Sequence, residues 1–112
     1  MTLLQLQYFK TLARVLHYTQ AAAELHIAQP SLSYSIKELE KELGVKLFEK
    51  DSRHIKLTVY GEQFLPYAER ALEMIDEGVG VLKQMAGSAQ QIVRLGYFYS
   101  ISASLIPAVM IG

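Results

Sequence analysis

The sequence contains no cysteine, so the chain has neither a disulfide framework nor a thiol nucleophile. Its formal net charge is zero, with 11 basic and 11 acidic residues, which by itself argues against a general binder of polyanions. Long hydrophobic runs are also missing, because the longest apolar stretch, at the C-terminus, is far too short to span a bilayer. The N-terminus does not resemble a signal peptide, since no basic segment leads into an apolar run there. We therefore expect a cytoplasmic protein that has no membrane partner.

Residues that would support catalysis or bind a metal are few. Three serines lie close together, but they have no base and orienting acid nearby, and the chain has no phosphate-binding loop. The histidines are scattered, without carboxylate or cysteine partners at ligand spacing, at His17, His26 and His54. The sequence therefore predicts a protein that is not an enzyme and that needs no cofactor or metal.

The 112 residues that are present have room for one domain, or for a small domain and a fragment of another. About half of them are apolar, so a packed core is feasible. The charge is unevenly distributed, because residues 1–58 carry eight basic and six acidic side chains and the remainder carries three and five. This gives the first half of the chain a weak basic bias, and dimerisation would double it.

Residues 18–43 are predicted to form two helices joined by a tight turn. Thr19 is a candidate N-cap for the first helix, and the three alanines that follow have high helix propensity. The turn covers residues 25–28, where His26 is expected to adopt a left-handed conformation. The second helix is expected to begin near Gln29, because Pro30 is tolerated in a first turn. A first amphipathic helix over residues 3–16 would complete a three-helix core.

The helix that is expected to begin near Gln29 has two distinct faces. Its apolar residues are spaced by three and four positions, at Leu32, Ile36, Leu39 and Leu43. The opposite face is polar and carries Gln29, Ser33, Tyr34, Lys37 and Lys41. Such side chains can bond base edges and phosphates, so this face is typical of a helix that binds in the major groove. The alternative is an ordinary solvated helix face, since serine, lysine and glutamate cover most exposed helices.

A small hairpin is predicted after this helix. Gly44 follows the helix as an expected left-handed cap, and two partly alternating segments, 45–50 and 55–58, flank the polar turn 51–54. Three helices and a hairpin make a winged helix, so the expected fold class is mainly α. Arg53 lies at the tip of the hairpin, where it could enter a minor groove. The alternative for Arg53 is a solvated loop arginine.

A long helix is predicted over residues 59–86, with Thr58 as its N-cap. Its apolar residues follow a heptad pattern, which Ala86 continues, and we call them the apolar seam: Leu65, Ala68, Leu72, Ile75, Val79 and Leu82. Because residues 1–58 are too few to cover this seam, we expect a homodimer, with a buried helix of a larger monomer as the alternative. Pro66 predicts a bend between Glu62 and Pro66, and Gly78 and Gly80 predict close backbone approach across the dimer.

Residues 87–91 are typical of a hinge, 92–99 of a strand and 105–109 of a short helix capped by Ser104. About twenty residues cannot supply the crossover and neighbour that a parallel strand needs, so we expect the chain to be a fragment. The apolar residues of segment 92–112 are expected to pack against another chain.

The run AAAELHIAQPSLSYSIKELEKELGVKLFEK, followed by IKLT at residues 55–58 and by Gly61, resembles the DNA-binding region of LysR-type transcriptional regulators. The resemblance covers nearly all of residues 3–70. It implies a winged helix-turn-helix in residues 1–58 (the helix-turn-helix at about 18–37), a dimerising linker helix in 59–86, and the start of an effector-binding domain of periplasmic-binding-protein type in 87–112. In that domain, Ser100 and Ser102 would line the cleft for a small-molecule effector.

The resemblance also implies a set of DNA contacts: Thr19, Gln29, Pro30, Ser31, Ser33, Tyr34, Lys37, Arg53 and Thr58. This sequence departs from the family pattern at Tyr34, where arginine or glutamine is common, and at Ala28, where serine or threonine is common. The first departure argues against direct guanine recognition by residue 34, and the second removes an N-cap worth about 1 kcal/mol.

The leading hypothesis is therefore a sequence-specific regulator of transcription that binds duplex DNA as a homodimer or a dimer of dimers. The alternative is a protein-interaction module, in which the same winged helix and dimerising helix present the polar face to a protein instead of DNA.

Overall fold

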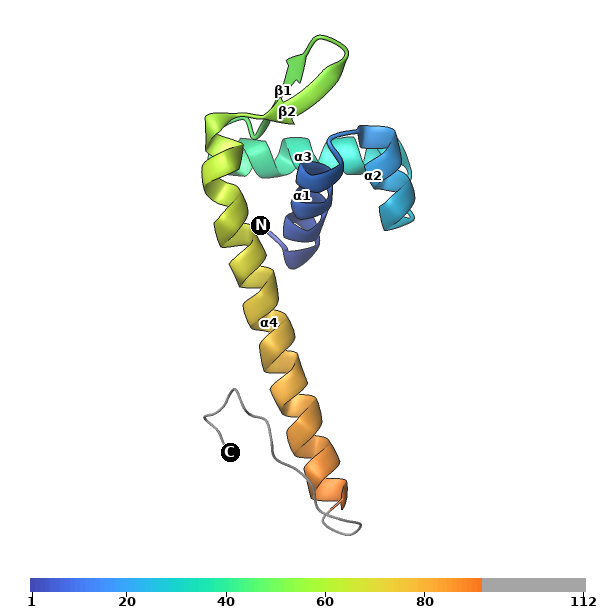
Figure 1. Ribbon diagram of the computed structural model, residues 1–112, viewed down its shortest axis with the longest axis vertical. Helices are drawn as coiled ribbons and strands as arrows, with labels where there is room; N and C mark the ends of the chain where they lie inside the picture. The colour runs from blue at the N-terminus through green and yellow to red at the C-terminus, as the bar shows by residue number, and fades with distance from the viewer. Residues whose placement is uncertain (92–112) are drawn as a thin grey trace. The chain divides into compact units, whose positions relative to one another are not determined.

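The structure, a computed structural model, describes residues 1–91 (Figure 1). Four helices and one two-stranded antiparallel sheet follow one another in the order α1 (Leu3–Val15), α2 (Tyr18–Leu25), α3 (Gln29–Leu43), β1 (Phe48–Asp51), β2 (His54–Leu57) and α4 (Val59–Gln91). This order confirms the predicted mainly helical fold with a three-helix core, a hairpin and a long helix. The predicted strand and helix within segment 92–112, together with Ser100 and Ser102, lie outside the described residues.

Local hydrogen bonds define both ends of α1. The Thr2 hydroxyl accepts a bond from the backbone N–H of Gln5 at 3.0 Å, and the Gln5 side chain accepts one from the backbone N–H of Thr2 at 3.0 Å. This reciprocal capping box satisfies two amides that a helix start otherwise leaves without partners. The helix ends at Val15, and the C-cap residue Leu16 adopts a left-handed conformation with φ of 55° while its N–H donates to the carbonyl of Leu12 at 2.7 Å.

The start of α2 differs from the prediction that Thr19 is its N-cap. The helix begins at Tyr18, and His17 is the N-cap residue, with extended backbone angles and with its Nδ1 accepting a bond from the N–H of Gln20 at 3.1 Å. The prediction was wrong because an imidazole nitrogen performs here the role usually filled by a hydroxyl or carboxylate. The left-handed conformation predicted for His26 is confirmed, with φ of 59°.

The boundaries of α3 agree with those predicted from the sequence. The helix begins at Gln29 with Pro30 in its first turn, and the N-cap residue Ala28 makes no side-chain capping bond. Gly44 ends it with φ of 76°, and its N–H donates to the carbonyl of Glu40. Because a left-handed conformation strains residues that have a Cβ, glycine suits this position.

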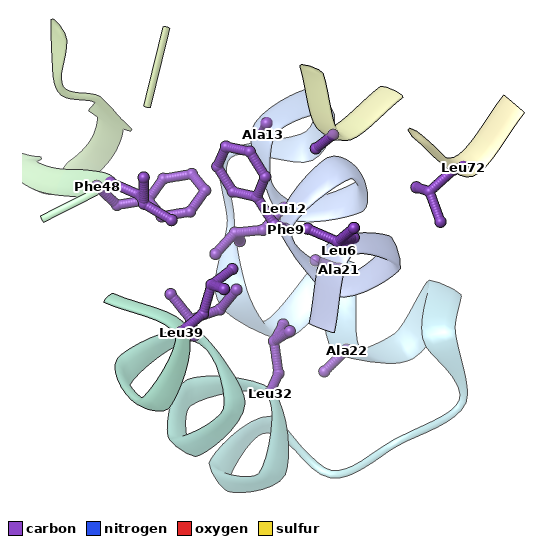
Figure 2. Packing of buried hydrophobic residues seen from close by; sticks show 13 residues of the cluster. Leu6, Phe9, Leu12, Ala13, Ala21, Ala22, Leu32, Leu39, Phe48 and Leu72 are labelled. Carbon is purple, nitrogen blue, oxygen red and sulfur yellow. The ribbon is translucent and has the colours of Figure 1, made fainter. Parts of the chain in front are cut away.

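The hydrophobic core lies where the first three helices meet (Figure 2). Phe9 and Leu12 of α1 are fully buried against the apolar stripe of α3, of which Leu32 and Leu39 are fully buried too. The Phe9 ring also packs edge-on against Phe48 of β1, with their centroids 5.6 Å apart. The small residues of α2, Ala21 and Ala22, complete the core.

The predicted hairpin is present, with a shorter turn than expected. Strands β1 and β2 pair in register from Phe48 opposite Leu57 to Asp51 opposite His54, so the turn consists of Ser52 and Arg53. Ser52 has φ of 60°, the left-handed region that two-residue hairpin turns use. We call this hairpin, residues 48–57, the wing.

Helix α4 begins as predicted and extends further than predicted. The Thr58 hydroxyl accepts a bond from the N–H of Gly61 at 3.1 Å, so Thr58 is the N-cap. The helix then runs for 33 residues through Pro66 to Gln91. Residues 87–91, for which a hinge was predicted, are helical here, because a single glycine at position 87 costs a helix only about 1 kcal/mol. The bend predicted at Pro66 stays a prediction. No helix among residues 1–91 has the length and apolar character to cross a membrane.

Candidate nucleic-acid interface

The outward face of α3 is a continuous set of solvent-accessible polar side chains. Burial of Leu32, Ile36 and Leu39 fixes the rotation of the helix about its axis, so the opposite side must face away from the core. Of the predicted contacts on this helix, Ser33 is half-buried and the others are exposed: Gln29, Pro30, Ser31, Tyr34 and Lys37. The structure therefore brings together all six α3 residues that the sequence analysis singled out.

Each acidic side chain of α3 already has a partner within the chain. The Glu40 carboxylate accepts bonds from backbone amides, and Glu42 lies 2.7 Å from the N-terminal ammonium of Met1. Glu38 makes a 3.7 Å pair with Lys41. Within the described part of the chain, no ion pair involves Lys37. Its positive charge is thus available to a phosphate or a base.

The wing presents a second cation. Arg53 occupies the two-residue turn and is exposed, as is Lys50 on β1. Neither makes an ion pair with another residue in the range 1–91, whereas Lys56 lies 4.0 Å from Glu49 across the strands. The wing therefore carries unpaired positive charge at its tip, as a contact to DNA would require.

The two predicted threonine contacts have different environments. Thr19 is exposed in the first turn of α2, where helix amides and the helix dipole favour an anion. Thr58 is only 9% exposed, and its hydroxyl donates to the carbonyl of Lys46 at 2.6 Å while accepting from Gly61. With both hydrogen-bonding roles occupied inside the protein, Thr58 has no donor left for a phosphate, and we leave it out of the candidate interface.

Glu40 is a residue that sequence reasoning missed. One of its carboxylate oxygens, Oε2, accepts bonds from the backbone N–H groups of Leu47 at 2.7 Å and of Phe48 at 3.2 Å. The bonds connect α3 to the segment that leads into the wing. The sequence carries no signal for them, because they join residues seven and eight positions apart across a turn.

The apolar seam of α4 is divided between two roles. Its first members, Ala68 and Leu72, are buried in the hydrophobic core of the compact unit Met1–Met74, and Leu65 packs against this core. The prediction that residues 1–58 cannot cover the seam was therefore wrong for this part, because its first members belong to the same buried cluster as the apolar residues of the first three helices. The later members remain exposed in the chain, at Ile75, Val79 and Leu82.

Gly78 and Gly80 have open space around them, since a Cβ built on either would meet no atom within 4 Å. No group of three or more histidine, cysteine, aspartate or glutamate side chains within residues 1–91 is placed to hold a metal ion.

The comparisons with known proteins agree on one family. The profile described as "Bacterial regulatory helix-turn-helix protein, lysR family" matches residues 3–62. The chain is 38% identical over 110 residues to the HTH-type transcriptional regulator BenM of Acinetobacter baylyi, covering 98% of this chain and 36% of BenM. It is 36% identical over 110 residues to the HTH-type transcriptional regulator AlsR of Bacillus subtilis, covering 98% of this chain and 36% of AlsR. The chain thus spans about a third of the length of these relatives.

Solved structures are similar over the same region. The DNA-binding domain of BenM, in a crystal structure with catB site 1 DNA, matches with a TM-score of 0.74 at 42% identity, covering 77% of this chain and 97% of that one. CbnR, described as a LysR family transcriptional regulator, matches with a TM-score of 0.71 at 36% identity, covering 74% of this chain and 29% of that one.

Proposed function

Because this chain belongs to the LysR family of bacterial regulatory helix-turn-helix proteins, we propose that it binds duplex DNA sequence-specifically and regulates transcription. The observation that carries the proposal is the exposed polar face of α3, from Gln29 to Lys37, opposite a fully buried apolar stripe. A helix with this division can enter the major groove, which is wide enough to admit it, while the rest of the fold supports it from behind. The relative BenM, in its DNA complex, shares this fold.

In the proposed complex, the N-terminal half of α3 contacts base edges. Gln29 is suited to bidentate hydrogen bonds with adenine, and Lys37 to guanine or phosphate. Tyr34 supplies a hydroxyl and an apolar ring in place of a guanine-binding arginine. Because Ala28 makes no capping bond, the N–H of Gln29 is also open to a phosphate, whereas Pro30 has no N–H and that of Ser31 donates to the carbonyl of Ala28.

Two further contacts lie outside α3. Arg53 is proposed to enter the adjacent minor groove, where a narrow A·T tract concentrates negative potential. Thr19 is proposed to hold a phosphate at the start of α2. These contacts would fix the register of α3 in the groove, because contacts to the phosphate backbone position a protein on the duplex.

We extend the proposal to assembly and regulation. The exposed members of the apolar seam, Ile75, Val79 and Leu82, would pair with a second copy in a homodimer, and two dimers could bind together. In a longer protein, a small-molecule effector would bind in a C-terminal domain whose start includes Ser100 and Ser102. The proposed role is that of a regulator, without catalysis.

Salt dependence of duplex binding tests the proposal against a protein-interaction module. Neutralising phosphates releases counterions, so the affinity for duplex oligonucleotides should fall steeply as salt rises. We expect Arg53→Ala and Lys37→Ala to reduce the slope of log affinity against log salt by about 1 each if they touch phosphates. A matched control is Lys83→Ala, which removes a lysine far along α4. Duplex binding that is absent, or that salt does not weaken, would favour the interaction module.

A further inference from the structure

Hydrogen bonds from α3 and from the N-cap residue of α4 converge on residues 46–48, at the base of the wing. On the α3 side, Oε2 of Glu40 accepts from the N–H groups of Leu47 and Phe48 at 2.7 and 3.2 Å. On the α4 side, the hydroxyl of Thr58 donates to the carbonyl of Lys46 at 2.6 Å, and its N–H donates to the carbonyl of Leu47 at 3.0 Å. The base of the wing is thus fixed to both helices by four bonds.

The two sides of this arrangement are not equivalent. The bonds of Thr58 join neighbouring parts of the chain at the end of β2, as part of the N-cap of α4. Glu40 instead lies within α3, the helix that carries the polar face, and its carboxylate is the part-buried acceptor for two successive amides. Amides that are shielded from water need an acceptor, and a charged acceptor makes the stronger bond. The Glu40 side chain therefore links the orientation of the wing directly to that of α3.

We infer that Glu40 is a positioning residue, whose carboxylate holds the wing at a fixed orientation to α3 so that Arg53 and the α3 face reach one duplex together. The inference rests on the proposed function for its DNA part. An interface that is fixed before binding loses less conformational freedom when the complex forms. Removing the link would leave α3 intact and would let the wing tip sample orientations in which Arg53 misses its groove.

A distance measurement without DNA tests the structural part of the inference, that Glu40 holds the wing in a fixed orientation to α3. The chain has no cysteine, so cysteines introduced at Gln20 on α2 and Lys50 on β1 can be spin-labelled uniquely. Pulsed-EPR distance distributions would compare Glu40→Met, which keeps the side-chain length without an oxygen, with Glu40→Gln, which keeps an acceptor. Glu38→Met on the same helix is the control. We expect a broad distribution for Glu40→Met only, whereas a Glu40→Met distribution as narrow as that of the parent protein would overturn the inference.

Should Glu40→Met fail to fold, hydrogen exchange in Glu40→Gln decides the same question. A neutral acceptor makes a weaker bond, so the amides of Leu47 and Phe48 should exchange at least about threefold faster, while the Gly61 amide, which bonds to Thr58, keeps its rate. Unchanged exchange at Leu47 and Phe48 would overturn the inference.

Duplex binding tests the functional half through a double-mutant cycle. In the parent protein, we expect Arg53→Ala to weaken binding about tenfold. In the Glu40→Met background, Arg53→Ala should weaken duplex binding less than about threefold, because the wing no longer holds Arg53 in place. Lys37→Ala should weaken duplex binding by the same factor in both backgrounds. If Glu40 only stabilised the fold, Arg53→Ala would weaken duplex binding equally in both backgrounds. That result would overturn the inference. Absence of salt-dependent duplex binding by the parent would instead reject the proposed function, and the EPR result would still stand.

Discussion

A Cβ placed on Gly61 would lie 2.3 Å from the carbonyl oxygen of Leu47. It would also lie 2.8 Å from a methyl carbon of Leu57. The first turn of α4 therefore packs directly on the backbone that leads into the wing, and glycine is the residue whose missing side chain permits that approach. The same carbonyl of Leu47 accepts the N–H of Thr58, so this contact and the hydrogen bond depend on each other.

Gly61→Ala is expected to destabilise the protein. The added methyl group would force the start of α4 away from Leu47, and overpacking of this kind costs about 1 to 3 kcal/mol. Urea denaturation would measure the loss as a lower free energy of unfolding. Gly87→Ala is the matched control, because nothing lies within 4 Å of that position and alanine is favoured in a helix by about 1 kcal/mol. A Gly61→Ala protein as stable as the parent would show that the contact is relieved at no cost.

Local signals predicted much of this fold. Helical spacing placed α1 and α3, and the left-handed conformation was predicted at His26 and Gly44, two of the four positions among residues 1–91 that adopt it. These features depend on residues within one turn of each other, so sequence alone contains them. The polar face of α3 follows from the same spacing, because burial of one stripe determines what the opposite side exposes.

Features that depend on contacts between distant residues were not predictable. The spacing of Ala68 and Leu72 is the same for a dimer seam and for a stripe that packs on the chain's own core, and only the structure separates the two. Glu40 and Gly61 showed no local signal, because their partners lie at the base of the wing. Thr58 was predicted as both an N-cap and a phosphate contact, and its burial leaves only the first of these roles.

The two parts of the apolar seam are expected to respond differently to truncation. Leu72 is 8% exposed in the core, so Leu72→Ala should lower the free energy of unfolding of the compact unit by about 2 to 5 kcal/mol. Leu82 is 66% exposed in the chain, so Leu82→Ala should leave that unit as stable as before. If Leu82 is buried in a dimer, its truncation should cost about 2 kcal/mol of association, or about 30-fold in the dissociation constant.

Urea denaturation and sedimentation equilibrium would separate the two effects. Met85→Ala, close to Leu82 on the same helix and outside the predicted seam, is the control for association. Equal dissociation constants for the parent and Leu82→Ala would contradict the predicted dimer seam.

Tyr18 is expected to make stability depend on pH in alkaline solution. Burial raises the pKa of Tyr18 above its ordinary value of 10.0, and the negative charge of Glu40 raises it further. The folded state therefore binds the phenolic proton more tightly than the unfolded state does. The resulting stabilisation is complete below pH 10.0 and is lost as the pH rises through the raised pKa of the folded state.

The test compares the free energy of unfolding of the parent and Tyr18→Phe at about pH 8 and about pH 11. The parent should lose more stability over this interval, because phenylalanine has no proton to lose. Tyr60→Phe, which replaces an exposed tyrosine, is the control. Parallel losses in the parent and Tyr18→Phe would rule out a contribution of Tyr18.

Gln29→Ala is expected to weaken binding to the preferred duplex and to relax the choice of base at one position. Gln29 is exposed at the first residue of α3, where a side chain can reach a base edge, and a good bidentate contact is worth about 1 to 3 kcal/mol. Binding to a library of half-sites would show the change as loss of preference at one base pair with the others retained. Gln20→Ala, an exposed glutamine on α2, is the control. If Gln29→Ala lowered affinity equally for every sequence, Gln29 would be a backbone contact, and base recognition would have to lie with Ser33, Tyr34 or Lys37.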